Sequence, residues 1–410
     1  MKVCVIGNGG REHALAWRLS ISPSVTKVYA IPGSAAMSDC AELVGIDWQQ
    51  SDHLIRFLKD NHVDLVVVGP EAPLVAGLAD VLNKAGIPVF GPSKAAAQLE
   101  GSKVFAKDVM KKYNIPTAAY GVFHNVDEAK EFIAQTGAPI VVKADGLAAG
   151  KGVVVAMTIE EANAAVEDML RGNRFGDAGS TVVIEEFMEG EEASLLAFVD
   201  GKTVVPMIAS QDHKRIFDGD KGPNTGGMGT YAPAPVLTDA LRDEAMKTIL
   251  APMVAAMEKE GMPYVGCLYA GLMITPQGPK VVEFNARFGD PETQVVLPLL
   301  DSDLGQVMMA CATGTLTADM VKWKDSSAAC VILASKGYPE TSSKGDVIHG
   351  DIKQHDTTIV FHSGTKLVGD EYVTNGGRVL GVVGLGKDLR TALDRAYGRI
   401  EHIDFEGMQY

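Results

Sequence analysis

Three polar side chains alternate with apolar ones in residues 281–287 (VVEFNAR). If this segment is a strand, Glu283, Asn285 and Arg287 share one face, because successive strand side chains point to opposite faces. Carboxylate and amide oxygens are hard ligands that suit Mg²⁺, and a guanidinium suits phosphate oxygens. The pattern predicts a strand that holds a metal ion and a polyphosphate. A strand with a solvated polar face is the alternative.

Glycines follow the first apolar segment, in residues 7–11 (GNGGR), and precede an expected helix at 12–20. Glycines let the backbone approach a phosphate, and a helix N-terminus adds positive potential. A nicotinamide dinucleotide site is the rival interpretation. Its fingerprint needs a third glycine where Glu12 stands, and an acid where residues 31–33 read Ile-Pro-Gly. The loop therefore predicts a phosphate site without a dinucleotide, with a merely tight turn as the alternative.

A second glycine-rich segment, residues 146–152 (GLAAGKG), is similar to a P-loop. The spacing between its glycines is one residue short, and Gly152 stands where a P-loop has Ser or Thr. Its flanks, residues 140–143 and 153–157, both read as strands. We therefore expect a hairpin beside Lys143 that closes over phosphates, with a solvent-exposed hairpin as the alternative.

Two charged runs have less specific patterns. Five acids lie within residues 185–192 (EEFMEGEE), which fits either a solvated strand edge or a site where carboxylates bind ribose hydroxyls. Residues 211–235 are expected to form a long irregular loop, and loops of this length are usually functional. Within it, Lys214 and Arg215 are candidates for binding an anionic substrate in an otherwise acidic chain.

The elements that must position these residues alternate between strands and helices over residues 2–90. This order predicts a doubly wound parallel α/β domain with right-handed crossovers. Residues 120–200 read as a small α+β unit, and a last α/β unit begins near residue 326. Further regular segments are expected as strands at 193–209, 264–286 and 379–385 and as helices at 73–85 and 388–400.

The composition narrows the class of protein. The chain has 410 residues, of which 46% are apolar and 22% charged, and its formal net charge is −15. This charge argues against broad nucleic-acid or membrane-surface binding. No apolar run reaches the ~18 residues that span a bilayer, and no secretory signal pattern is present, so we expect a cytoplasmic protein. The five scattered cysteines favour neither a disulfide framework nor a zinc site.

Together these segments resemble the ATP-grasp enzymes, and among them the glycinamide ribonucleotide synthetase family. The resemblance extends over nearly the whole chain, and the number and order of its motifs make it specific. The motifs are GNGGREHA at 7–14, GPEAPL at 69–74, GSKVFA at 101–106, VKADGLAAGKGV at 142–153, EEFMEGEEAS at 185–194, QDHKR at 211–215, PNTGGMG at 223–229 and EFNARFGDPE at 283–292. Two small departures, at Asn8 and Met188, lie at no charged or metal-binding position.

The resemblance implies a multidomain α/β and α+β fold. An N-terminal doubly wound parallel α/β domain at 1–101 would bind the substrate phosphate. An ATP-grasp domain at 102–325 would include a small lid subdomain at about 120–190. A C-terminal α/β domain would occupy 326–410.

The resemblance also implies residue roles. The ATP-binding residues would be Lys103, Lys143, Gly146, Gly150, Gly152, Glu185, Glu186, Phe187 and Glu192. The metal ligands, for Mg²⁺ or Mn²⁺, would be Glu283 and Asn285, and the catalytic residues would be Arg287, Lys143 and Asp212. The residues that bind the other substrates would be Gly9, Gly10, Arg11, Glu71, Lys214, Arg215, Asn224, Thr225, Gly226 and Asp290.

The activity that the resemblance implies is the ATP-dependent joining of glycine to 5-phosphoribosylamine through glycyl phosphate, in purine biosynthesis. The partners would be these small molecules alone, without nucleic acid or membrane, and the chain would be a monomer. Such catalysis needs positioning and charge neutralisation rather than a covalent nucleophile. Another ATP-grasp carboxylate ligase, a nicotinamide dehydrogenase and a non-catalytic nucleotide-binding regulator remain as alternatives.

Overall fold

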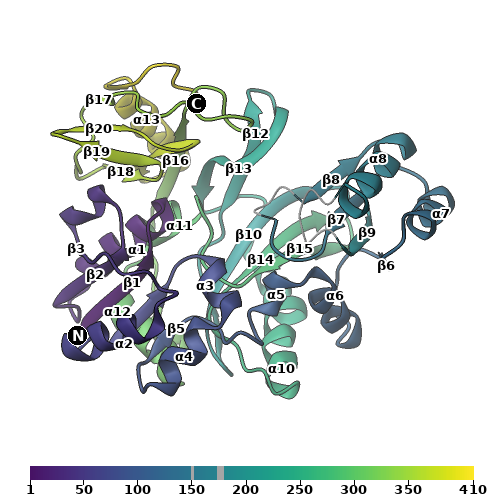
Figure 1. Ribbon diagram of the computed structural model, residues 1–410, viewed down its shortest axis with the longest axis horizontal. Coiled ribbons are helices and arrows are strands. Elements are labelled where there is room, and N and C mark those ends of the chain that lie inside the picture. Colours follow the sequence, from purple (N-terminus) through teal and green to yellow (C-terminus); the bar gives the residue numbers. More distant parts are fainter. Residues whose placement is uncertain (149–151, 173–179) are drawn as a thin grey trace.

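The computed structural model describes residues 1–148, 152–172 and 180–410. Figure 1 shows an N-terminal unit and a C-terminal unit beside each other, and a small lid subdomain at the far side of a central sheet. Among the described residues, no helix is long and apolar enough to cross a membrane.

The N-terminal unit is a five-stranded sheet in the order β3-β2-β1-β4-β5, and all of its paired strands are parallel. The central strand β1 buries side chains on both of its faces, at Val3 on one face and Cys4 on the other, as expected of a parallel strand that helices cover on both sides. The doubly wound α/β prediction is therefore confirmed. The elements are β1 (Lys2–Gly7), α1 (Gly10–Ser20), β2 (Lys27–Pro32), η1 (Ala35–Asp39), β3 (Glu42–Leu43), α2 (Ser51–Asp60), β4 (Leu65–Val68), α3 (Glu71–Ala76), α4 (Leu78–Lys84) and β5 (Val89–Phe90).

Residues 73–85 form two helices rather than the single helix expected. The break falls at Gly77, whose φ of 97° is a left-handed conformation that ends α3 and begins α4. Because of this break, α3 is a short helix with Glu71 in its first turn.

The central sheet is antiparallel, in the order β11-β10-β14-β15. Its strand β15 carries the polar segment from which the site was predicted. The strands are β10 (Glu191–Asp200), β11 (Val204–Pro206), β14 (Val265–Thr275) and β15 (Gly278–Asn285). The helices around it are α5 (Gln98–Gly101), α6 (Lys103–Lys112), α9 (Asp239–Ala245), η3 (Met246–Leu250), α10 (Ala251–Lys259), α11 (Thr293–Val296), η4 (Leu297–Leu299), α12 (Leu304–Thr313) and η5 (Ala318–Met320).

The lid subdomain is an antiparallel sheet in the order β6-β9-β7-β8, covered by two helices. Its apolar side chains form a separate core that includes Ile133, Val142 and Val166. The expected pairing of strands around the glycine hairpin is confirmed, because β7 pairs with β8 from Ile140↔Ala156 to Lys143↔Val153. The elements are β6 (Tyr120–Phe123), α7 (Val126–Thr136), β7 (Ile140–Ala144), β8 (Val153–Ala156), α8 (Ile159–Leu170) and β9 (Val182–Glu186).

Residues 211–235 are not an irregular loop, and this prediction was wrong. They form a hairpin of β12 (Gln211–Phe217) and β13 (Lys221–Ala232), which joins the C-terminal sheet in the order β12-β13-β16-β21-β18. The pairing of Gly229 with Val331 places β13 beside a strand from the C-terminal unit. Glycines and register shifts obscure the strand pattern in the sequence, and the partner that stabilises it lies far along the chain.

The C-terminal unit supplies the other three strands of this sheet and the elements that pack around it. They are β16 (Ser327–Ala334), β17 (His349–Gly350), β18 (Thr358–His362), β19 (Thr365–Val368), β20 (Glu371–Thr374), β21 (Arg378–Gly386), α13 (Leu389–Ile400) and β22 (Ile403–Asp404). The strand and helix expected at 379–385 and 388–400 correspond to β21 and α13.

Candidate active site

Two lysines from different elements are held close to strand β15 and the glycine hairpin. The buried ammonium of Lys143, on β7, donates a 3.1 Å hydrogen bond to the carbonyl of Val282 on β15. Lys103 begins α6, and its ammonium donates a 3.0 Å hydrogen bond to the carbonyl of Gly146. Burial lowers the pKa of Lys103, and the nearby Glu283 opposes this shift by favouring the charged form. The structure thus brings together two cations that the sequence placed forty residues apart.

The base of the glycine hairpin is tied to the start of α6. One carboxylate oxygen of Asp145 accepts hydrogen bonds from the backbone N–H groups of Lys103 (2.7 Å) and Val104 (3.3 Å). At Gly152, a Cβ would lie 2.7 Å from the Cβ of Ala148, so only glycine allows this close approach. Gly150 lies outside the described residues.

Glu283 faces several cations. Burial raises the pKa of its carboxyl, but Lys214, Lys143, Lys103 and Arg287 outweigh this effect and hold the pKa below its ordinary value. The side chain is therefore ionised at neutral pH. An ionised carboxylate is a suitable ligand for a divalent cation, and the basic side chains around it suit the anionic substrate that such a cation accompanies.

Arg287 follows β15, and its guanidinium is fixed between two carboxylates. Its Nε lies 3.4 Å from Glu71 and its Nη2 lies 3.1 Å from Glu100. Nη2 also donates a 3.5 Å hydrogen bond to the amide oxygen of Asn285, which places these two predicted residues together. Glu100 was missed by the sequence analysis, and no spacing pattern marks it. The acid was recognisable only from its contact with Arg287.

The predicted ATP-binding residues at the end of β9 include one buried and one exposed acid. Glu185, on β9, is buried, and its carboxylate lies 2.7 Å from Nζ of Lys143 and 2.6 Å from Nζ of Lys107. Glu186 is exposed, and Phe187 is partly buried. Lys107 was also missed, although it lies one helical turn after Lys103, a spacing that places both lysines on one face of α6.

Hairpin β12–β13 carries three of the predicted site residues, Asp212, Lys214 and Arg215. The Asp212 carboxylate raises the pKa of Lys214 above its ordinary value, against the effect of burial. One carboxylate oxygen of Asp212 is buried and accepts no hydrogen bond from the described residues. Arg215 is used within the hairpin, where it donates a 2.8 Å hydrogen bond to the carbonyl of Gly222. The Asp212 carboxylate therefore keeps an acceptor oxygen that a substrate can use, with the ammonium of Lys214 nearby.

Thr225 and its neighbours on β13 stabilise the hairpin. The Thr225 hydroxyl donates a 2.7 Å hydrogen bond to the carbonyl of Lys214 and accepts one of 3.0 Å from the N–H of Gly227. Asn224 is exposed opposite Arg215, and Glu192 is exposed on β10.

The amino-terminal glycine loop is anchored by carboxylates. Gly9 caps α1, and its N–H donates a 3.1 Å hydrogen bond to Glu12, while the N–H of Arg11 donates one of 3.2 Å to Asp290. A phosphate bound here would therefore compete with Asp290 for the Arg11 N–H. The guanidinium of Arg11 is buried against Glu12 and lies 4.0 Å from Glu71.

Asp290 is the point at which three distant segments meet. Arg378 of β21 donates hydrogen bonds to the backbone carbonyls of Asp290 (2.9 Å) and Gly226 (3.0 Å). Gln294 donates a 2.8 Å hydrogen bond to the Asp290 carboxylate. Arg378 carries no sequence signal, because the carbonyls to which it donates lie 88 and 152 residues away in the chain.

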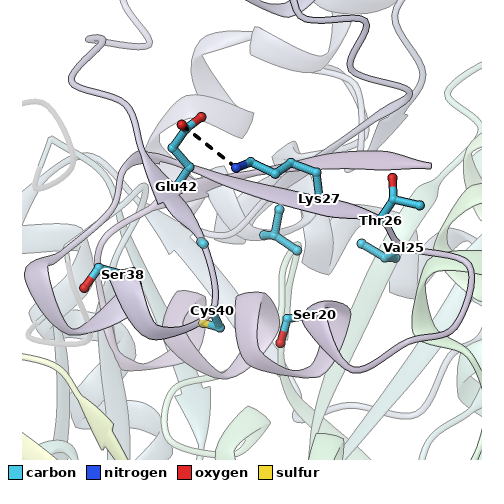
Figure 2. A pocket seen from close by; sticks show the side chains of 9 residues that line it. Ser20, Val25, Thr26, Lys27, Ser38, Cys40 and Glu42 are labelled. Carbon is cyan, nitrogen blue, oxygen red and sulfur yellow. Dashed lines mark ion pairs between the residues drawn. The ribbon is translucent and has the colours of Figure 1, made fainter.

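One pocket lies apart from all of these residues. Figure 2 shows it between the end of α1 and strands β2 and β3. Its volume is about 310 Å³. Lys27 and Glu42, 3.9 Å apart, are the charged side chains that line it. No predicted site residue borders this pocket.

A lysine of the lid and a lysine of α6 thus lie beside an acid-bearing strand of the central sheet. This is an ATP-grasp ligase fold, because residues 101–293 match the ATP-grasp domain of phosphoribosylglycinamide synthetase. As an ATP-grasp enzyme, the chain uses ATP and a divalent metal ion. Residues 1–100 match the N domain and residues 328–410 the C domain of the same synthetase, so the chain belongs to the phosphoribosylglycinamide synthetase family.

Individual relatives agree with this assignment. The phosphoribosylamine–glycine ligase of Neisseria meningitidis serogroup A is 54% identical, and the alignment covers 100% of this chain and 97% of that protein. The crystal structure of the Thermotoga maritima phosphoribosylamine–glycine ligase has a TM-score of 0.87 at 34% identity, covering 100% and 99% of the two chains. A biotin carboxylase domain from Hydrogenobacter thermophilus, solved with magnesium ADP, has a TM-score of 0.77 at 17% identity over 100% and 91%, and shares the fold.

Proposed function

We propose that the chain joins glycine to 5-phosphoribosylamine in purine biosynthesis, with ATP converted to ADP and phosphate. The observation that carries this proposal is the full-length match to phosphoribosylamine–glycine ligases. The carboxylate of glycine attacks the γ-phosphorus of ATP, which forms glycyl phosphate and releases ADP. The amine of 5-phosphoribosylamine then attacks the acyl carbon, expels phosphate and loses a proton, which leaves glycinamide ribonucleotide.

Lys103 and Lys143 bind the ATP phosphates in this proposal. The support is their common position beside Gly146 and Val282, in a partly desolvated place where one unit charge has a large effect. Arg287 stabilises the transferred phosphoryl group, and Glu71 and Glu100 fix its guanidinium before the substrate arrives.

Glu283 and Asn285 hold the divalent cation, as Mg²⁺ or Mn²⁺. Their oxygens fit such an ion, and Glu283 is ionised. The described residues contain no group of three or more His, Cys, Asp and Glu side chains that would form a metal cage. Phosphate oxygens and water would therefore complete the coordination. When bound, the cation neutralises phosphate charge.

The remaining predicted residues divide between nucleotide and substrates. Gly146, Gly150 and Gly152 form the phosphate lid, Glu185, Glu186 and Phe187 lie at the adenine, and Glu192 binds the ribose. Asp212 and Lys214 contact glycine or the ribosyl group. The support is a buried oxygen of Asp212 that accepts no hydrogen bond from the described part of the chain. The residues assigned to 5-phosphoribosylamine are Gly9, Gly10, Arg11, Glu71, Arg215, Asn224, Thr225, Gly226 and Asp290.

The test is a phosphate-release assay with ATP and glycine, with and without freshly made 5-phosphoribosylamine. We expect sustained release only when all three are present, and a product with the mass of glycinamide ribonucleotide. Sustained release with ATP and another carboxylic acid, but none with glycine, would assign the chain to a different ATP-grasp ligase. We also propose that the chain is a cytoplasmic monomer, which light scattering of the purified enzyme would check for oligomeric state.

A further inference from the structure

A buried charge triad joins the lid to helix α6 and includes a lysine without an assigned role. The two carboxylate oxygens of Glu185 each face one ammonium group: Oε1 lies 2.6 Å from Nζ of Lys107, and Oε2 lies 2.7 Å from Nζ of Lys143. The exposed fractions of Lys107, Glu185 and Lys143 are 3%, 3% and 4%. Charges this deeply buried are found where they are paired, and here two cations share one anion.

Both lysines of the triad are also anchored to the strand that carries Glu283. Lys107 donates a 2.7 Å hydrogen bond to the hydroxyl of Thr117, which donates one of 2.7 Å to the carbonyl of Val281. Lys143 donates to the next carbonyl, that of Val282. Contacts with the lid and with the central sheet therefore fix the three side chains in one arrangement, as a preorganised site requires.

The balance of charge in the triad depends on Lys107. With Lys107 present, one positive charge is left over after Glu185 is neutralised, and Lys143 is beside the predicted phosphate site. Without Lys107, Lys143 and Glu185 would form a neutral pair. In a poorly solvated site, this difference changes the attraction for an anion much more than it would in water.

We propose that Lys107 is a positioning residue for ATP: it neutralises Glu185, so that the charge of Lys143 remains available to the ATP phosphates. This inference rests on the proposed function in one respect, because it takes the anion that binds beside Lys143 to be ATP. The competing explanation is purely structural, in which Lys107 only fastens α6 to the lid. The two explanations make different predictions for a variant in which Lys107 and Glu185 are neutralised together.

The experiment measures the affinity for ADP with magnesium by titration calorimetry, the KM values for ATP and glycine, and the melting temperature. Lys107→Met removes the charge and keeps the length of the side chain, and it leaves the Lys143–Glu185 pair in place. We expect it to weaken ADP binding and raise the KM for ATP about tenfold, with the KM for glycine nearly unchanged. Lys107→Arg, which keeps the charge, should stay within about threefold of the unmodified enzyme.

The decisive variant is the double substitution Lys107→Met with Glu185→Gln, which restores one unpaired charge at Lys143. We expect it to bind ADP several-fold more tightly than Lys107→Met alone. Lys112→Met is the matched control, because Lys112 lies on the same helix in an exposed pair, 2.6 Å from Glu260. It should bind ADP like the unmodified enzyme.

Several outcomes would overturn the proposal. One is an ADP affinity of Lys107→Met equal to that of the unmodified enzyme. Another is a folded double variant that binds ADP no more tightly than Lys107→Met. If the methionine variants do not fold, a folded Lys107→Arg that loses ADP affinity tenfold would overturn it instead. ADP binding is measured without glycine or 5-phosphoribosylamine. An enzyme that binds ADP but does not join these substrates would therefore contradict the proposed function and still test Lys107.

Discussion

Lys143 and Val282 are joined by a 3.1 Å hydrogen bond from the lysine ammonium to the backbone carbonyl, although 139 residues separate them in the chain. Val282 directly precedes Glu283, so a lysine of the lid is anchored beside the proposed metal-binding carboxylate. The proposed phosphate site and the proposed metal site are therefore adjacent. A substitution of the lysine should change the KM for ATP, whereas a substitution of Glu283 should change the turnover.

Lys143→Ala should raise the KM for ATP by at least about tenfold, because it removes a buried cation from the phosphate site. The fold should survive, since Glu185 keeps Lys107 as a partner. Steady-state titration of ATP at saturating glycine measures the effect. Lys130→Ala is the control within the lid, because Lys130 pairs with Glu167 near the surface. Unchanged ATP dependence at low ATP would contradict the phosphate role of Lys143.

Glu283→Gln should reduce turnover by about a hundredfold or more, because the amide keeps one oxygen ligand but removes the negative charge that the ionised carboxylate offers a divalent cation. Activity should be measured over a range of Mg²⁺ and Mn²⁺ concentrations, with circular dichroism to confirm the fold. Glu260→Gln, which removes an acid from an exposed pair, is the comparison variant. Normal turnover of Glu283→Gln at limiting Mg²⁺ would show that Glu283 is not a metal ligand.

Gly10→Val should raise the KM for 5-phosphoribosylamine strongly and leave the ATP and glycine dependences nearly unchanged, if the amino-terminal loop binds the substrate phosphate. A Cβ at Gly10 would lie 2.4 Å from Oγ of Ser363 and 2.8 Å from Nε2 of Gln294, so packing must also shift. Ser363→Ala disturbs the same contact without adding bulk to the loop, and it should leave all three KM values unchanged. A shift in ATP dependence alone would assign the loop to the nucleotide.

His13→Asn should reduce the pH dependence of stability between pH 7 and pH 5. Burial, assisted by His362, lowers the pKa of His13 from 6.5 to about 3, and its Nδ1 accepts a 3.0 Å hydrogen bond from the His362 N–H. The unfolded chain therefore binds a proton below about pH 6.5 that the folded chain does not, so stability is present above this pH and falls as pH decreases.

The contribution of His13 to this loss is about 2 kcal/mol between pH 7 and pH 5. Asparagine keeps an acceptor near the position of Nδ1 and does not titrate. Urea unfolding at the two pH values measures the difference in free energy of unfolding. An equal loss of stability in His13→Asn and in the unmodified enzyme would show that His13 does not contribute.

Sequence patterns over short segments determined many of the helices and strands of this protein and marked several site residues. The helix at Leu389–Ile400 and the hairpin of β7 and β8 were predictable from the sequence, because periodicity, turn residues and strand propensity act over a few neighbouring residues. The motifs also marked Lys103, Lys143 and Glu283. A lysine offers a cation for phosphate and a glutamate offers an oxygen ligand for a metal ion, so their residue types alone indicate these roles.

Only the tertiary structure decided which of these groups meet, and in what state of charge. Three contacts join segments that lie far apart in the chain: the ion pair of Glu100 with Arg287, the hydrogen bond from Arg378 to Asp290, and the pairing of β13 with β16. No local propensity encodes such partners. They form because folding buries polar groups that must then find a hydrogen-bond or charge partner, and the nearest partner in space is set by how the domains pack.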